Sequence, residues 1–321
     1  MDSVIDQHLN GIRQQKTLQT GSLIVSLFGD AVLPRGGGIW LGSLIRLLEP
    51  LGMNERLVRT AVFRLVKDGW LETETHGRRS NYRLTASGRR RFEDASRHIY
   101  ASNAPTWDRR WRLILVVGDI DAKDREQLRR ALFWQGFGAL GNQCFVHPGA
   151  DLAAALDTLA ADGMEDHLKQ LMPLMAADIR SGLAAGNADL VARAWDLSGL
   201  AGDYRAFVDT YRPLLDGMRH ERHDERMAES AFLLRVLLIH DYRRLLLRDP
   251  ELPDVLLPAG WPGHEARLLC KDIYRRLWAP SESHLEHHMR LADDTVPAPD
   301  PHMPPRFADD DSLRTVAAAA F

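Results

Sequence analysis

The spacing of apolar residues near the start of the chain predicts two short helices, over 21–33 and 39–51. Between them, the sequence Pro-Arg-Gly-Gly-Gly at 34–38 interrupts the pattern, because proline lacks a backbone donor and glycine is a poor helix former. A third helical pattern begins at residue 54. Only residues 52–53 separate it from the second helix, a spacing typical of a helix-turn-helix motif.

The third helix has two different faces. It starts after Asn54, which is able to cap the first free amides, and ends before Gly69. The apolar positions fall on one stripe that we expect to be buried, formed by Val58, Ala61, Val62 and Leu65. The opposite face carries Phe63 and five residues that we expect to contact the major groove of DNA or its phosphates: Arg56, Arg59, Thr60, Arg64 and Lys67.

Two strand patterns, at 70–75 and 82–84, follow the third helix and predict a β-hairpin. Arg78 and Arg79 lie in the connection between them, and Arg83 lies on the return strand. We expect these three arginines to form the wing of a winged helix-turn-helix, where they would contact backbone or minor groove. The alternative is a small helical domain whose charged face is merely solvated.

Beyond a linker at 101–105, the chain has the pattern of a ferredoxin-like α/β unit. The apolar periods predict, in order, a strand at 111–117, a helix at 124–135, a strand at 144–146 and a helix at 152–161. A closing strand is not evident in 163–187, so the fold of that segment stays open.

The rest of the chain reads as helical up to residue 291. The helix predicted over 230–248 is apolar nearly all round, which indicates burial between other helices. After Asp293, proline and aspartate are frequent and aromatic residues are few, which predicts disorder, apart from a short helix at 312–320. We therefore expect an α+β protein with a winged-helix domain at 1–100, a ferredoxin-like middle domain at 105–180, a helical C-terminal effector and dimerisation domain at 188–292, and a disordered tail at 293–321.

Charge is distributed unevenly over the 321 residues, although the net charge is only −3. Residues 1–100 contain 15 Lys and Arg against 10 Asp and Glu, and residues 54–91 contain 10 against 4. The remaining 221 residues contain 26 against 34. A basic head on an acidic body favours contact of the head alone with nucleic acid, because phosphates repel the body.

The two cysteines, Cys144 and Cys270, lie far apart in the sequence, and no secretory signal precedes them. A reduced, cytoplasmic setting is therefore expected. The most apolar stretch, 231–239, is short and is interrupted by Arg235, so we expect no membrane span and no membrane partner.

Six motifs are spread over most of residues 20–280, at Arg59–Leu71, Tyr82–Gly88, Trp195–Leu197, His240–Arg244, Asp249–Pro253 and Trp261–Gly263. Together, and in this order, they resemble the PaaX family, bacterial repressors of phenylacetic acid catabolism operons. The resemblance implies a winged-helix head, a Cas2-like ferredoxin fold in the middle and a helical C-terminal domain. It also implies a homodimer that represses from double-stranded operator DNA and is released by an aryl-acyl-CoA, typically phenylacetyl-CoA.

A site for a CoA thioester should combine arginines with aromatic rings. The sequence offers such a combination at the end of the buried helix and in a proline-rich loop, namely His240, Tyr242, Arg243, Arg244 and Trp261. The alternative is that Tyr242 and Trp261 are core residues and that the two arginines pair with Asp241 and Asp249.

Enzyme motifs are mostly absent, and we expect neither catalytic residues nor a cofactor. The remaining enzymatic alternative is a metal-dependent nuclease, because Asp119 and Asp121 follow the first strand of the middle unit, near where Cas2-like nucleases place a metal-binding aspartate. Histidines with helical spacing also occur, at 220 and 223 and at 284, 287 and 288. Without a cluster of zinc ligands around them, solvated surface histidines are the preferred interpretation.

Overall fold

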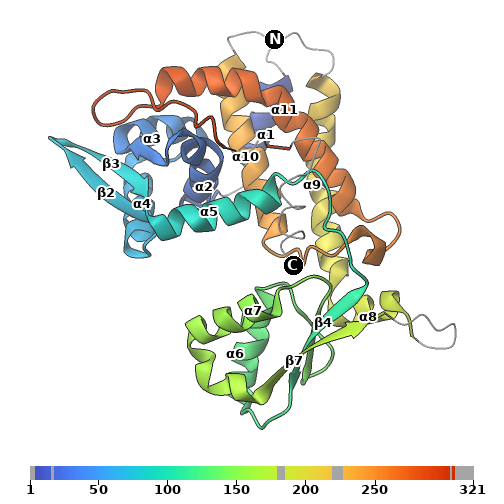
Figure 1. The fold of residues 1–321 in the computed structure, drawn as a ribbon. Coiled ribbons are helices and arrows are strands. Elements are labelled where there is room, and N and C mark those ends of the chain that lie inside the picture. The colour runs from blue at the N-terminus through green and yellow to red at the C-terminus, as the bar shows by residue number, and fades with distance from the viewer. Residues whose placement is uncertain (1–3, 16–17, 179–184, 219–226, 304–305, 308–321) are drawn as a thin grey trace. The chain divides into compact units, whose positions relative to one another are not determined.

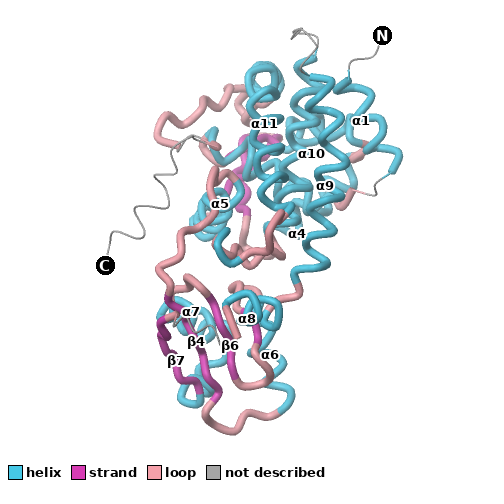
Figure 2. The backbone as a smooth tube through the Cα atoms, turned by 90° about the vertical axis from the view of Figure 1, so that its right-hand side faces the viewer, coloured by secondary structure: helices cyan, strands magenta, loops and turns pink. Residues whose placement is uncertain are grey.

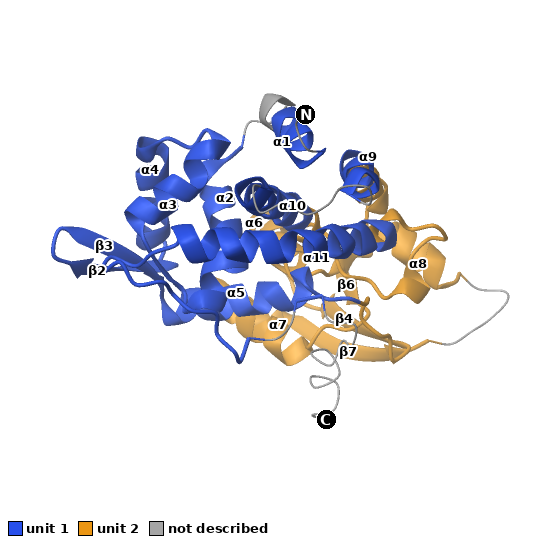
Figure 3. Cartoon of the chain, turned by 90° about the horizontal axis from the view of Figure 1, so that it is seen from above, with its two compact units in different colours: residues 1–102, 206–244, 264–321 blue, residues 103–205, 245–263 orange. Residues whose placement is uncertain are grey.

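The computed structural model describes residues 4–15, 18–178, 185–218, 227–303 and 306–307. The chain divides into two compact units. Unit 1 comprises residues 1–102, 206–244 and 264–321, and unit 2 comprises residues 103–205 and 245–263 (Figure 3). This division differs from the expected separation of the winged-helix and C-terminal domains, because most of the C-terminal helices share a unit with the N-terminal elements.

Residues 20–99 of unit 1, which we call the winged head, have the element order of a winged helix-turn-helix. The elements are α2 (Thr20–Leu27), β1 (Gly38–Trp40), α3 (Leu41–Leu48), α4 (Glu55–Lys67), β2 (Leu71–His76), β3 (Arg79–Leu84) and α5 (Ala86–Ile99). The strands form an antiparallel sheet in the order β1-β3-β2, and β2 and β3 project as a long hairpin, the wing (Figure 1).

The helices of the head differ in detail from their predicted bounds. After α2 the chain makes a π-helical turn at Phe28–Val32 and a 3-10 turn at Leu33–Arg35. Gly36 and Gly37 then take φ values of +86° and +76°, a conformation that ends the helix and that glycine adopts without strain. The second helix begins at Leu41 because the three residues before it pair with β3 as β1.

The remaining helices of unit 1 come from the start of the chain and from the segment between residues 206 and 288. They are α1 (Val4–Gln15), the C-terminal part of α9 (Leu197–Met218), α10 (Ala228–Leu246) and α11 (Pro262–His288). Residues 231–240 of α10 are all buried, which confirms the expectation from its apolar circumference. Within the described part of the chain, none of the helices is long and apolar enough to cross a membrane.

Unit 2 contains a β-α-β-β-α-β arrangement, the ferredoxin-like topology. Its elements are β4 (Arg110–Val116), α6 (Ala122–Phe133), β5 (Gly138–Ala139), β6 (Cys144–His147), α7 (Leu152–Leu159) and β7 (Leu171–Ala177). The sheet is antiparallel in the order β5-β6-β4-β7, and α6 and α7 lie side by side on one of its faces (Figure 2). Side chains such as Ile114, Leu128 and Phe145 form the core between the sheet and these helices. The expected α+β fold class is confirmed.

The closing strand that the sequence left open is β7, which pairs with β4 along its whole length. Its sequence, LMPLMAA, contains a proline and no β-branched residue, so local propensity gives little indication of a strand. Pro173 is tolerated because β7 is an edge strand, where one side of the backbone has no strand to donate to.

The other face of the sheet in unit 2 is covered by α8 (Asn187–Ala194) and the short 3-10 helix Asp254–Leu256. Two tryptophans mark this contact. The rings of Trp111 and Trp195 lie 6.3 Å apart, and the indole of Trp195 donates to the carbonyl of Gly136 at 3.0 Å. Trp195 is therefore a packing residue of unit 2.

Part of the segment expected to be disordered is in contact with the winged head. The backbone amide of Asp300 donates to the carbonyl of Pro34, and Arg35 donates to the carbonyl of Pro297 at 3.0 Å. Phe307 is buried against Tyr100 and Tyr274. These hydrogen bonds and ring contacts hold a segment with few apolar residues against the rest of unit 1. The helix expected at 312–320 lies outside the described residues.

Candidate nucleic-acid interface

The N-terminus of α4 is stabilised as its sequence predicts. The side chain of Asn54 accepts a hydrogen bond from the backbone amide of Leu57 at 3.0 Å, and Glu55 lies in the first turn, where the helix dipole favours a negative charge. At the other end, Gly69 has a φ of +72°. These local interactions define both ends of the helix.

The buried side of α4 packs against α2. Val58, Ala61 and Val62 are buried, as predicted, and α2 is the helix with which α4 makes its most extensive contact. Leu65 is only half-buried, so the apolar stripe is shorter than its sequence spacing indicated. The packing orients the opposite side of α4 toward solvent.

The exposed side of α4 carries all five residues that we expected there, namely Arg56, Arg59, Thr60, Arg64 and Lys67. Arg59 forms an ion pair with Glu55 one turn away, at 2.6 Å. Among the described residues, Arg56, Arg64 and Lys67 form no ion pair, so three cations remain available to an anionic partner. The hydroxyl of Thr60 donates to the carbonyl of Arg56 at 2.8 Å.

The wing turns at Gly77 and Arg78, between the paired residues His76 and Arg79. Gly77 has a φ of +59°, which suits the first central position of a two-residue hairpin turn. Arg78 is exposed at the tip, and among the described residues it has no ion-pair partner. The wing therefore presents one uncompensated cation at its end.

Arg83 and Arg79 have more partners within the protein than their position on the wing indicated. Arg83 forms an ion pair with Glu74 on the neighbouring strand at 2.6 Å, and this hydrogen bond holds the pKa of Glu74 below its usual value. Arg79 forms an ion pair with Asp294 at 2.5 Å, and its guanidinium lies 4.5 Å from the ring centroid of Trp40. Arg79 thus supports the wing as well as facing solvent.

The segment 288–294, which begins at the last residue of α11 and which we call the brace, bonds to three elements of the winged head. The amide of Trp40 donates to the carbonyl of Arg290 at 3.0 Å, and the hydroxyl of Ser43 donates to the carbonyl of residue 288 at 2.7 Å. The amide of Ala292 donates to the side chain of Asn81 on β3 at 2.7 Å. The C-terminal helix is thereby joined to both α3 and the wing.

The residues expected to bind an effector lie partly against the winged head. Arg243 donates to the hydroxyl groups of Ser22 and Ser26 on α2, at 2.9 and 3.1 Å, and the ring of His240 is 3.1 Å from Ser26. Burial lowers the pKa of the Arg243 guanidinium, and the neighbouring charge of Arg244 adds to the effect. These contacts connect the end of α10 to the helix on which α4 packs.

The other expected effector residues have separate environments. Tyr242 is buried, with its ring centroid 5.7 Å from that of Phe207, as the core-packing alternative predicts. Arg244 is exposed. Trp261 belongs to unit 2, where its indole packs against the ring of Tyr204 with centroids 5.9 Å apart.

Unit 1 also contains a buried ionic cluster that sequence reasoning missed. Asp30, in the π-helical turn of the head, accepts hydrogen bonds from Arg235 of α10 at 2.7 Å, from Tyr100 and Tyr274, and from Arg306. Burial alone would raise the pKa of Asp30, but these arginines and hydroxyl groups outweigh it and hold the pKa below its usual value. The interruption of an apolar run by Arg235 was its one sequence signal.

A second negative group completes the buried cluster. Glu282 on α11 accepts from Arg235 at 2.6 Å and from Arg35 of the head at 2.7 Å. The cluster therefore connects the head, α10, α11 and the C-terminal segment through charged hydrogen bonds.

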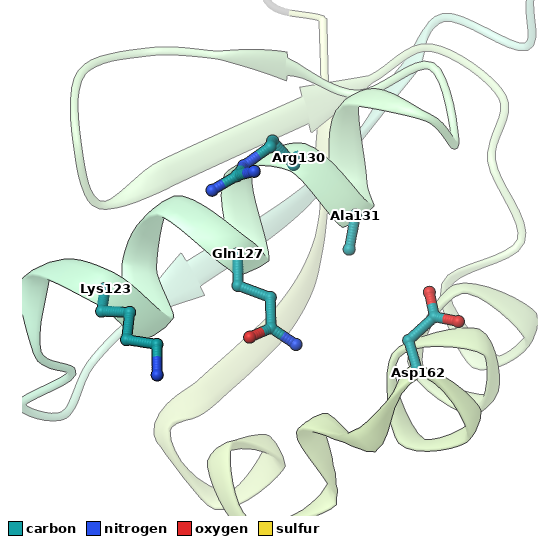
Figure 4. Close-up of a pocket in the computed structure, with 5 residues that line it drawn as sticks. All are labelled: Lys123, Gln127, Arg130, Ala131 and Asp162. Carbon is teal, nitrogen blue, oxygen red and sulfur yellow. The ribbon is translucent and has the colours of Figure 1, made fainter.

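A shallow cavity of about 420 Å³ lies on unit 2, beside α6. Lys123, Gln127 and Ala131 line it at successive turns of the helix, and Asp162 faces them (Figure 4). Its lining contains no aromatic residue and none of the residues that we expected to bind an effector.

The aspartates considered for a nuclease have other surroundings. Asp121 caps α6 by accepting from the backbone amide of Asp124 at 2.8 Å, and Asp119 is exposed. In the described ranges, His, Cys, Asp and Glu side chains form no group of three placed to hold a metal ion. His284 stacks on Phe232, and burial lowers its pKa to about 4, whereas residues 220 and 223 lie outside the described ranges.

Regions that match known protein families make up most of the chain. Residues 19–88 match the PaaX-like protein family, residues 104–174 match the PaaX protein central Cas2-like domain, and residues 195–287 match the PaaX-like protein C-terminal domain. A structure of the uncharacterized protein Rv0674 from Mycobacterium tuberculosis is similar, with a TM-score of 0.52 and 24% sequence identity. That similarity covers 83% of this chain and 99% of the other, and it shows a shared fold.

A curated relative is more similar in sequence. The protein named transcriptional repressor PaaX from Escherichia coli (strain K12) is 39% identical over 302 residues, which cover 93% of this chain and 92% of the relative. The three matched regions occur in the same order as the winged head, the ferredoxin-like unit and the C-terminal helices described above. The chain belongs to the PaaX family.

Proposed function

We propose that this protein is a transcriptional repressor that binds operator DNA through the exposed face of α4 and through the wing. The observation that carries the proposal is the exposed face of α4, where Arg56, Arg64 and Lys67 form no ion pair among the described residues. A helix of this kind fits the major groove, and its cations neutralise phosphates. The relative named as a transcriptional repressor supports the same role, that of a regulator rather than an enzyme.

The proposed operator is a palindrome read by a homodimer. Two winged heads related by a two-fold axis would contact half-sites about one helical turn apart, or a multiple of that distance. The acidic remainder of the chain is repelled by phosphate, which favours binding through the heads alone.

The proposed target is an aromatic-acid catabolic operon of the phenylacetate type, and the proposed effector is an aryl-acyl-CoA such as phenylacetyl-CoA. We place its anionic groups at the end of α10, near Arg243 and Arg244. Because Arg243 bonds to Ser22 and Ser26 of α2, a phosphate that competes for this guanidinium would loosen α10 from the helix that supports α4. A differential affinity of ~1–3 kcal/mol between the two states is sufficient for such coupling.

Fluorescence anisotropy with promoter fragments from aryl-CoA ligase operons of the same genome tests this function. We expect tight, salt-dependent binding to a palindromic fragment, and release by phenylacetyl-CoA but not by free phenylacetate or free CoA. Equal affinity for all fragments would contradict the repressor proposal. Operator binding without any response to CoA thioesters would contradict only the proposed effector.

A further inference from the structure

Phe63 has an unusual place on α4. Phe63 is 69% exposed, although burial of a phenylalanine normally stabilises a fold. The residues that attach α4 to the head lie on the opposite side of the helix, so the ring contributes little to that packing. An apolar ring in the middle of a cationic surface therefore requires an explanation beyond folding.

Helical geometry places Phe63 at the centre of the exposed face. Arg56, Thr60, Phe63 and Lys67 are separated by four, three and four positions, so they form one stripe along the helix. Arg59 and Arg64 lie on either side of this stripe and, at about 100° per residue, point about 140° apart. The face thus has a central row flanked by one arginine on each side.

This arrangement matches the cross-section of a major groove. The walls of the groove are rows of phosphates, which suit the flanking arginines, and its floor consists of base edges. On that floor the C5-methyl group of thymine is the apolar feature, and phenylalanine is one of the side chains that contact it. The cations around the ring favour a polyanion over an apolar protein surface as the partner.

We propose that Phe63 is a specificity-determining residue that contacts a thymine methyl group in each half-site. The inference rests on the proposed function and deepens it, because it assigns a base contact to Phe63 in the central row and leaves phosphate contact to the cations of α4, with Arg59 and Arg64 facing the walls of the groove. A thymine contact adds sequence preference without adding charge, so it should leave the salt dependence of binding unchanged.

A methyl-deletion cycle on the full-length protein tests the proposal. The purified protein first selects its preferred duplex from a random pool, and each thymine pair related by the palindrome is then replaced by deoxyuridine, which lacks only the methyl group. We expect one such replacement to weaken binding of the unmodified protein by about fourfold per half-site, the equivalent of one buried methyl group. Phe63→Ala should bind the thymine and deoxyuridine duplexes equally well.

Phe133→Ala is the matched control, because Phe133 is also an exposed phenylalanine at 51% but lies on α6 of unit 2. It should retain the full deoxyuridine penalty. The proposal is overturned if Phe63→Ala keeps that penalty, or if no thymine position is sensitive. Failure of the protein to select any sequence would contradict the repressor function itself, whereas sequence-specific binding that ignores the methyl groups removes only the role of Phe63.

Discussion

Arg235 of α10 donates a hydrogen bond to the carboxylate of Asp30 in the winged head across 2.7 Å, and each side chain is only 1% exposed. The pair joins α10, in which residues 231–240 are all buried, to the π-helical turn that follows α2. Since α2 also supports α4, the proposed DNA-contacting helix is connected to the C-terminal helices through buried, charged contacts.

Removal of one partner of this pair should strongly destabilise unit 1. Asp30→Ala leaves the guanidinium of Arg235 buried beside fewer acceptors, and we expect a loss of about 3–5 kcal/mol in the free energy of unfolding. Urea denaturation followed by tryptophan fluorescence measures it. Arg97→Ala, which removes an exposed ion pair on α5, is the control and should cost about 0–1 kcal/mol. Similar values for both variants would mean that the cluster is not structural.

Substitution by alanine should have different effects on stability at Arg78 and at Arg79, two neighbouring positions of the wing. Arg78→Ala removes a cation without an ion pair among the described residues, so the melting temperature should stay constant while the slope of log affinity against log salt falls by about one unit. Arg79→Ala should also lower stability, by about 0.5–1 kcal/mol, because it removes the contacts with Trp40 and Asp294. Equal melting temperatures for the two variants would contradict the assigned supporting role.

On α4, Arg64→Ala should weaken operator binding by about 1–3 kcal/mol. Arg59→Ala should cost less, because Glu55 already neutralises part of the charge of Arg59. Anisotropy titrations at fixed salt, with circular dichroism to verify folding, compare the two variants. Unchanged binding by the folded double variant would remove α4 as the recognition helix.

The stability of unit 2 should depend on pH through the protonation of His147. Burial, with the charge of Arg112, lowers the pKa of this ring to about 4, and its Nδ1 accepts a hydrogen bond from the amide of Gly149 at 2.8 Å. The unfolded state, with a pKa near 6.5, therefore binds more protons between pH 6.5 and 4, and stability should fall over that window by up to about 1.4 kcal/mol per unit. Below about pH 4, which is the pKa of His147 in the folded state, both states bind the proton and the stability stops falling.

Thermal unfolding at a series of pH values checks this dependence, with His147→Gln as the comparison. The variant should show a flatter profile between pH 6.5 and 4, because glutamine does not titrate there. Parallel profiles for the two proteins would mean that His147 is not the responsible group.

The variants Arg244→Ala and Arg243→Ala should differ in DNA binding and in their release from DNA by the effector. Arg244 is exposed, so Arg244→Ala should leave DNA binding intact while it weakens release by phenylacetyl-CoA, for which we expect micromolar affinity (~8 kcal/mol). Arg243→Ala should change both properties, because Arg243 also bonds to α2. Ser22→Ala, which removes the hydroxyl of Ser22 but keeps the bond of Arg243 to Ser26, is the control. Full release from the double variant Arg243→Ala/Arg244→Ala would place the ligand elsewhere.

Several local features of the protein could be predicted from the sequence. The cap at Asn54, the apolar positions of α4 and the glycine at the end of that helix act within a few residues, so their outcome depends little on the rest of the chain. The hairpin was also predicted, although pairing extends β3 back to Arg79 and leaves only Gly77 and Arg78 in the turn. Motifs spread along the chain were sufficient to indicate the family.

Other features of the fold, such as β7 and the position of the segment after Asp293, depend on contacts between segments that are distant in the sequence. β7 forms because β4 offers it an edge, in spite of Pro173 and the absence of β-branched residues. The segment after Asp293 is poor in apolar residues, yet the head supplies partners for its backbone and for Arg306.

The same distinction applies to the candidate DNA-binding surface. The position of Arg78 and Arg79 near the end of a hairpin follows from the sequence, because strand pairing and turn formation there are local. The contacts of Arg79 with Trp40 and Asp294, and the exposure of Arg78 to solvent, depend on the folded chain. A single residue type is sufficient to predict a positive charge, but the partner of that charge depends on which remote segment the fold brings within a few ångströms.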